Sequence, residues 1–115
     1  MPVEVDKESI YENFMDDEEL IFESIDMFME SSNTRCKALQ EAVQQKDAER
    51  VMAEAHALKG VVGLFSPGDV FEAAKKVELM GRNNALAGID EAFSDFKSKL
   101  DELIVILKQW RDGED

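Results

Sequence analysis

The chain is 115 residues long, with 44% hydrophobic residues, two prolines and six glycines, which describes one helix-prone globular domain and excludes a disordered or fibrous protein. It carries 26 acidic and 13 basic residues, a formal net charge of −13, so its field repels nucleic acids and anionic lipids and favours protein partners with basic faces. We therefore expect no nucleic-acid partner and no membrane association, since the longest apolar run, residues 103–107, is too short to span a bilayer.

The first predicted element is a short helix around residues 6–15, "DKESIYENFM", from which Ile10 and Phe14 would cover one end of the core. The acidic run at residues 16–19 is interpreted as the N-terminus of a long helix rather than as a metal site, because acidic side chains stabilise that end of a helix. The long helix follows from apolar and small residues at three-and-four spacing: Ile21, Ile25, Phe28, Ser32, Cys36, Leu39 and Val43.

The next helix is predicted to begin near Asp47, a good N-cap residue. Its apolar stripe consists of Val51, Ala55, Leu58, Val62 and Phe65. It should stop at "SPGD", residues 66–69, where Ser66 could cap the following helix, Pro67 would take its first position and Asp69 its first turn.

Two further stripes complete the pattern, one of Val70, Ala73, Ala74, Val77 and Met80, and one of Phe93, Phe96, Leu100, Leu103, Leu107 and Trp110. The first of these helices should end at "GRNNA", residues 81–85, where Gly81 and the asparagines supply turn chemistry. No stretch alternates with period two, and the connections are short. The sequence predicts an all-α single domain over residues 1–115, an antiparallel up-down four-helix bundle with a short N-terminal capping helix and a bundle core of about residues 14–112.

His56 is the only histidine of the chain. On an ideal helix it points about 140° away from the apolar stripe, so we expect it to face outward. Gly60 and Gly63 lie within about 40° of it on the following turns, Met52 lies on the preceding turn, and Lys59 lies on the flank toward the core. Each helical glycine costs roughly 1 kcal/mol relative to alanine, so the two glycines predict a surface cleared for the approach of another molecule.

An exposed imidazole is largely neutral at pH 7 and offers a nucleophilic ring nitrogen. Lys59, one turn away, could pair with an anion on that nitrogen, such as a phosphoryl group. The alternative is a surface histidine without a role.

Other chemistries find little support in the residues. One histidine and the distant, single Cys36 provide no metal ligand set, and no calcium-binding loop is present. Cys36 has no second histidine to activate it and fits the core stripe. Without a phosphate-binding glycine loop the chain should not bind ATP, so we expect neither a metal nor a cofactor. A lone cysteine and the lack of a secretory signal predict a cytoplasmic location.

The segment "AHALKGVVGLF", residues 55–65, resembles the signature of histidine-containing phosphotransfer (HPt) domains, and the resemblance extends from about Phe14 to Trp110. It implies a four-helix bundle that carries a phosphoryl group on a histidine and exchanges it with aspartates of receiver domains. Such a protein is a phosphoryl carrier without an ATP site of its own, not an enzyme, and Mg²⁺ is expected only in the receiver partner.

The resemblance also implies roles for individual residues. His56 would be the phospho-acceptor through Nε2, Lys59 would stabilise the phosphoryl group, and Gly60 would allow the receiver to approach. Glu78, in "KVELMG", matches the position from which a Glu or Gln of the neighbouring helix bonds the other imidazole nitrogen, fixing the tautomer and leaving Nε2 free to attack.

The sequence departs from the family pattern in the second half of the signature. Val61 and Val62 replace small residues, Leu64 stands where a polar residue is usual, and Ser66 stands where another glycine is common. We interpret Leu64, with Met52, as an apolar docking contact beside the histidine.

Three functional hypotheses remain open from the sequence. The first is a phosphorelay intermediate, whose partners would be response-regulator receiver domains and a sensor or hybrid histidine kinase. The second is the N-terminal phospho-acceptor domain of a chemotaxis-type histidine kinase. The third is a non-catalytic helical interaction module in which His56 is incidental. A monomer is expected.

Overall fold

The computed structural model describes residues 3–65 and 68–113, which form five helices and no strand. The helices are α1 (Lys7–Asn13), α2 (Glu18–Gln44), α3 (Ala48–Val62), α4 (Asp69–Arg82) and α5 (Ile89–Arg111). The predicted all-α class is confirmed. Within these ranges, no helix is long and apolar enough to cross a membrane.

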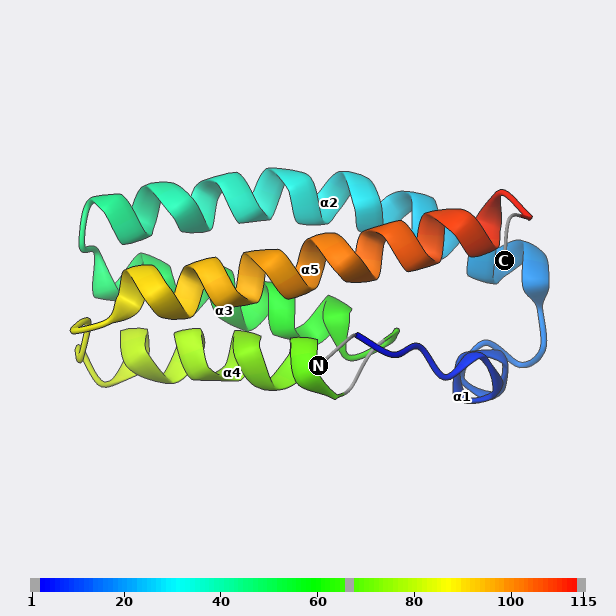
Figure 1. Cartoon of the computed structure of the whole chain (residues 1–115), viewed down its shortest axis with the longest axis horizontal. Coiled ribbons are helices and arrows are strands. Elements are labelled where there is room, and N and C mark those ends of the chain that lie inside the picture. The colour runs from blue at the N-terminus through cyan, green and yellow to red at the C-terminus, as the bar shows by residue number, and fades with distance from the viewer. Residues whose placement is uncertain (1–2, 66–67, 114–115) are drawn as a thin grey trace.

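Helices α2 to α5 lie side by side along the long axis of a molecule measuring 41 × 25 × 21 Å (Figure 1). Helices α3, α4 and α5 each run in the opposite direction to the helix before them, and contacts between α2 and α5 close the ring of four helices. The short α1 lies at one end of the bundle and packs against α2. The short connections between consecutive helices thus place α3 directly against α4.

The predicted stripes meet in one core. Leu39 of α2, Leu58 of α3, Val77 of α4 and Leu103 of α5 are completely buried. Phe65 is also buried, with its ring 5.2 Å from that of Phe28, but it lies beyond the end of α3 rather than on its last turn as the stripe predicted. These residues lock α3 in one orientation, which decides the direction of its outward face.

Aspartate side chains begin three of the helices. Asp6, Asp17 and Asp47 are the N-caps of α1, α2 and α3, and each accepts a hydrogen bond from a backbone N–H three residues on, at 3.1–3.2 Å. Glu18 and Glu19 occupy the first turn of α2. The acidic run at residues 16–19 therefore serves the start of α2, as predicted, and Asp47 starts the helix that carries His56.

The two ends of α4 differ from the prediction in detail. The helix begins at Asp69 with Gly68 as its N-cap and no capping side chain, while the predicted roles of Ser66 and Pro67 fall outside the described residues. At the other end, Asn83 follows the helix and Asn84 takes a positive φ of 51°.

Gly81 does not supply the turn that the sequence suggested. It lies inside α4 and is buried against the start of α3, where a Cβ atom would be 2.6 Å from the Met52 backbone nitrogen and 2.8 Å from the Ala48 carbonyl oxygen. Any side chain here would collide with the backbone of α3. The glycine is needed because the two helices approach closely, and this approach brings their facing side chains together.

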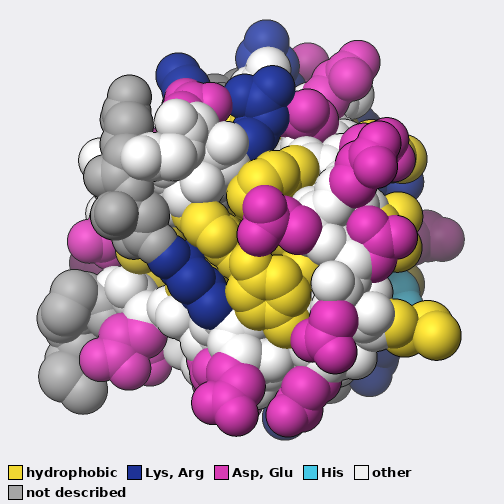
Figure 2. Space-filling model, turned by 90° about the vertical axis from the view of Figure 1, so that its right-hand side faces the viewer, with side chains coloured by type: hydrophobic (Ala, Val, Ile, Leu, Met, Phe, Trp, Pro, Cys, Tyr) yellow, Lys and Arg dark blue, Asp and Glu magenta, His cyan; other side chains and the backbone are white. Residues whose placement is uncertain are grey.

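The predicted cover by Ile10 and Phe14 is present at the end of the bundle where α1 lies. Ile10 is buried, and the half-buried Phe14 stacks on Phe65 with ring centroids 6.1 Å apart. Tyr11 of α1 makes an edge contact with Trp110 of α5. Figure 2 shows this end, with hydrophobic side chains at its centre and many acidic side chains around them.

Candidate functional site

His56 lies on the outward face of α3, with 66% of its side chain exposed. Its Nδ1 atom is 2.8 Å from Oε2 of Glu78 on α4. The ring therefore turns one nitrogen toward the neighbouring helix, while the rest of the imidazole stays accessible to another molecule.

Glu78 is an unusual residue in this fold because its carboxylate is buried, with only 1% of the side chain exposed. Three side chains surround it. Oε2 faces both His56 Nδ1 and Arg82 Nη2, each at 2.8 Å, and Oε1 faces Lys59 Nζ at 2.7 Å. Two helices thus contribute to one cluster of four polar residues, which we call the His56 cluster: His56, Lys59, Glu78 and Arg82.

The charge state of Glu78 decides what the cluster can do. Burial raises the pKa of its carboxyl, but hydrogen bonds and attraction from Lys59 and His56 outweigh burial and hold that pKa below its usual value of 4.5. At neutral pH Glu78 is an ionised acceptor, so the proton of the neutral ring belongs on Nδ1. The free lone pair is then on Nε2, and this nitrogen can act as a nucleophile.

Lys59 is partly buried, with 23% of its side chain exposed, and its ammonium also lies 5.9 Å from the centre of the Phe71 ring. The structure thus places this lysine beside His56 but pairs it with Glu78. For Oε1 of Glu78, the described residues supply no partner besides this ammonium.

The surface near His56 is open at one predicted glycine and not at the other. A Cβ atom on Gly60 would meet no atom within 4 Å, whereas one on Gly63 would touch the Phe71 ring at 3.5 Å. Gly63 therefore borders a side chain of α4, whereas Gly60 faces open space. Leu64 is 45% exposed and Met52 is half-buried.

Comparison of the sequence with known protein families gives a match. The family model of the Hpt domain matches residues 23–110. The chain belongs to the Hpt domain family. The predicted resemblance is thereby confirmed, and family membership supports a part in histidine phosphotransfer of two-component systems.

A solved structure supports the fold of this Hpt domain. The crystal structure of histidine-containing phosphotransfer protein B (HptB) from Pseudomonas aeruginosa PAO1 superposes with a TM-score of 0.86 over 94% of each chain, at 20% sequence identity. No curated protein shows significant sequence similarity to the chain.

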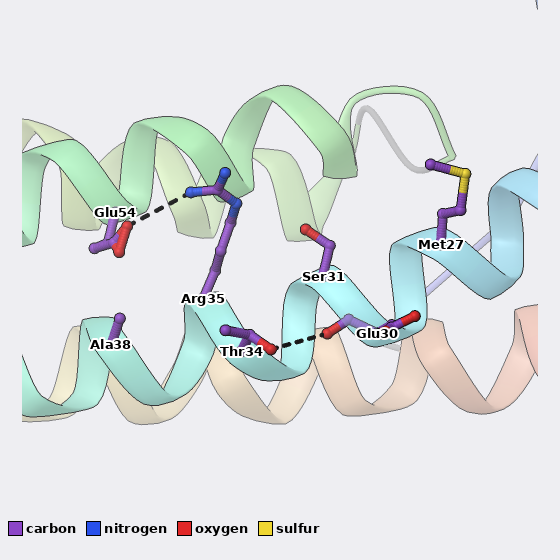
Figure 3. Close-up of a pocket in the computed structure, with 7 residues that line it drawn as sticks. All are labelled: Met27, Glu30, Ser31, Thr34, Arg35, Ala38 and Glu54. Carbon is purple, nitrogen blue, oxygen red and sulfur yellow. Dashed lines mark hydrogen bonds and ion pairs between the residues drawn. The ribbon is translucent and has the colours of Figure 1, made fainter.

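A groove lies between α2 and α3 of this Hpt domain, and no residue of the His56 cluster lines it. It is about 530 Å³ in volume and is lined by Met27, Glu30, Ser31, Thr34, Arg35, Ala38 and Glu54 (Figure 3). Arg35 of α2 reaches across it to Glu54 of α3, with 3.6 Å between Nη1 and Oε1. The Arg35 guanidinium is thus paired with Glu54, while His56 and Lys59 pair with Glu78 of α4.

Metal and thiol chemistry find no site in the described part of this Hpt domain. No group of three or more His, Cys, Asp and Glu side chains in it is arranged to hold a metal ion. Cys36 is buried in the core, and burial raises the pKa of its thiol. A buried thiol with a raised pKa is a poor nucleophile.

Arg82 is the member of the His56 cluster that the sequence reading missed. It lies four residues after Glu78 on α4, a spacing at which opposite charges on a helix are neighbours. That spacing could have indicated the pair, but an isolated i,i+4 pair is common on helix surfaces. Only the burial of Glu78 shows that this arginine belongs to the site.

Proposed function

We propose that the chain is a phosphoryl carrier of a two-component phosphorelay, which accepts a phosphoryl group on Nε2 of His56 and exchanges it with an aspartate of a receiver domain. The observation that carries this proposal is the 2.8 Å contact between His56 Nδ1 and the buried Glu78 carboxylate. It favours the ring tautomer whose exposed nitrogen has a lone pair.

The transfer itself requires little chemistry from the carrier. The Nε2 lone pair attacks the phosphorus of an aspartyl phosphate; the P–N bond forms as the P–O bond breaks, and the electron pair of that bond leaves with the aspartate carboxylate. The proton stays on Nδ1, where the negative charge of Glu78 balances the positive charge that the ring acquires. Positioning and electrostatics dominate phosphoryl transfer, so Lys59 is proposed as the cation beside the phosphoryl oxygens.

The proposed partners are response-regulator receiver domains and a sensor or hybrid histidine kinase, which would supply the phosphoryl group because the sequence has no phosphate-binding glycine loop. Gly60 would leave room for the receiver, with Leu64 and Met52 as apolar contacts. Mg²⁺ would be held by the receiver and not by this chain. We propose a monomer acting in the cytoplasm, as the sequence predicts.

The proposal is tested by incubating the protein with a receiver domain that carries a radioactive phosphoryl group on its aspartate. We expect label on the chain that is labile in acid and stable in base, as a phosphoramidate bond is. His56→Gln removes the only histidine and should take no label. Folding of the variant is checked by circular dichroism.

Two outcomes would contradict the proposal. Equal labelling of wild type and His56→Gln would place the phosphoryl group elsewhere. Labelling by a separate ATP-binding kinase domain, without exchange from any receiver, would instead favour the phospho-acceptor domain of a chemotaxis-type kinase.

A further inference from the structure

Once a phosphoryl group is present, two anionic groups of the site compete for the Lys59 ammonium: the Glu78 carboxylate and the phosphoryl group. In the structure its ammonium is 2.7 Å from Glu78 Oε1. A phosphoryl group on Nε2 brings about two negative charges to the same neighbourhood and competes for this ammonium. If Lys59 turns toward that group, Oε1 of Glu78 loses the partner that the described residues give it.

A buried carboxylate that loses a cation tends to take up a proton, because burial penalises its charged form. A protonated Glu78 could donate to Nδ1 instead of accepting from it. It would no longer offset the positive charge of the phosphorylated ring, and in the free ring it would favour the proton on Nε2, which removes the nucleophile. The cluster therefore needs a second cation that stays in place.

Arg82 fits this requirement. Its Nη2 atom is 2.8 Å from Oε2 of Glu78, the oxygen that also faces His56. It lies on the same helix as Glu78, one turn further on, and 54% of its side chain is exposed, so this pair is held within α4 and does not depend on Lys59 of α3. An arginine guanidinium also differs from an ammonium in its planar fork of donors, which suits a carboxylate.

We propose that Arg82 is a positioning residue that keeps Glu78 ionised and directed at Nδ1 of His56 while Lys59 binds the phosphoryl group. This inference rests on the proposed function, since it assumes that the phosphoryl group is carried by His56. It assigns the two cations of the cluster to different tasks, one beside the phosphoryl group and one beside the carboxylate.

The charged groups around Glu78 are few enough for this assignment to be tested. His56 and Lys59 face it from α3, and Arg82 faces it from α4. The ion pair that α2 presents to α3, Arg35–Glu54, does not include any residue of the cluster. Among the described residues, no charged side chain of α2 or α5 forms an ion pair with the cluster.

The first experiment uses NMR on the unphosphorylated protein. The single histidine gives one set of ring ¹⁵N signals, which report the tautomer, and the ¹³C signal of the Glu78 carboxyl reports its titration. Wild type, Arg82→Gln, Lys59→Ala and the double variant are compared, with Lys59→Ala imitating a lysine that has turned away. We expect each single variant to keep the Nδ1–H tautomer at pH 7, and the double variant to lose it as Glu78 takes up a proton at higher pH.

The second experiment measures the rate at which the protein accepts a phosphoryl group from a labelled receiver between pH 6 and 8. Arg82→Gln should slow acceptance on the order of tenfold, as loss of a residue that orients a reacting ligand does, and most strongly at the acid end. Arg82→Lys should restore most of the rate. Arg111→Gln, which removes the same charge from a residue paired with Asp26, should match wild type.

The outcomes separate this inference from the proposed function. If wild type takes no label, the proposed function fails, whatever Arg82 does. The inference fails if wild type takes label but Arg82→Gln leaves the Glu78 titration, the ring tautomer and the pH profile unchanged in both the wild-type and Lys59→Ala backgrounds. Arg82 would then form only an ordinary ion pair on the helix surface. Should the double variant not fold, the ¹³C signal of Glu78 in phosphorylated Arg82→Gln decides, and a titration equal to that of phosphorylated wild type overturns the inference.

Discussion

At the scale of single residues, the chain places one buried carboxylate beside its one histidine. Glu78 is ionised because Lys59 and His56 offset the cost of its burial, and Arg82 donates a further hydrogen bond to Oε2. The same contacts that make the burial tolerable also orient the imidazole of His56. The stability of the fold and the proposed chemistry therefore both depend on the Glu78 side chain. The contribution of its charge can be measured by a substitution that removes the charge and keeps the shape.

Glu78→Gln makes that change. The variant leaves Lys59 and Arg82 without their anion, so we expect the free energy of unfolding at pH 7 to fall by about 1–3 kcal/mol. The folded-state pKa of Glu78 lies below 4.5, so the stabilisation from its charge is complete well above pH 4.5 and is lost as pH falls through the folded-state value. The difference between wild type and variant should thus shrink on acidification below pH 4.5. Urea unfolding at several pH values measures it.

Glu102→Gln is the matched control, because Glu102 is exposed on α5. Its free energy of unfolding should stay within about 0.5 kcal/mol of wild type. A Glu78→Gln penalty that stayed constant from pH 7 to pH 3 would contradict an ionised, stabilising carboxylate in the folded protein.

The sequence predicted part of this site and could not predict the rest. The outward direction of His56 followed from helical geometry, and the position of Glu78 followed from the family resemblance. The pairing of Lys59 with Glu78 did not, because the direction of a long flexible side chain depends on a neighbour from another helix. Arg82 escaped notice because its importance depends on the burial of Glu78, which is a property of the packed bundle.

At the scale of elements, the approach of α3 and α4 places Glu78 against His56, and Gly81 permits that approach. Gly81 and Gly60 offer a matched pair of substitutions, since both are helical glycines and only Gly81 faces another backbone. Gly81→Ala should lower the free energy of unfolding by about 1–3 kcal/mol, because its methyl group would push α4 away from α3. Phosphoryl acceptance should fall as Glu78 moves away from Nδ1.

Gly60→Ala should behave in the opposite way in thermal unfolding followed by circular dichroism. A methyl group at Gly60 meets open space, so the higher helix propensity of alanine should raise stability by up to about 1 kcal/mol. Acceptance from a receiver should nevertheless fall if this space is where the receiver approaches. A Gly81→Ala protein as stable as wild type, with an unchanged rate, would show that the helices have room to adjust.

The helices themselves were predictable because their apolar stripes are long and regular, and three of their N-caps are aspartates. The interpretation of Gly81 as a turn residue was wrong for a physical reason. A glycine near the end of a helix suits a turn as well as a close helix contact, and only the packing of α4 on α3 distinguishes the two. The neighbour of Gly63 could not be predicted either, since Phe71 belongs to another helix.

At the scale of the whole molecule, a net charge of −13 surrounds a site that holds two cations. With a neutral imidazole, Lys59 and Arg82 leave the His56 cluster with a net charge of +1. This local charge suits a phosphoryl group, while the acidic surface elsewhere favours partners with basic faces. The positive site on an acidic surface exists only while the helices of the bundle stay packed together. Helix α1 contributes to this packing by closing one end of the core.

The last prediction concerns this closure. Ile10 of α1 is buried, so Ile10→Ala should lower the free energy of unfolding by about 2–5 kcal/mol. Trp110, the only tryptophan, contacts Tyr11 of α1, so its fluorescence reports this end, while circular dichroism reports all the helices. If α1 belongs to the cooperative unit, the two urea transitions should coincide in wild type and variant alike. Met15→Ala, at an exposed position, should change neither transition.

A fluorescence change that precedes the loss of helix would mean that α1 unfolds on its own. Because the His56 cluster involves only α3 and α4, folded Ile10→Ala should accept phosphoryl groups at the wild-type rate.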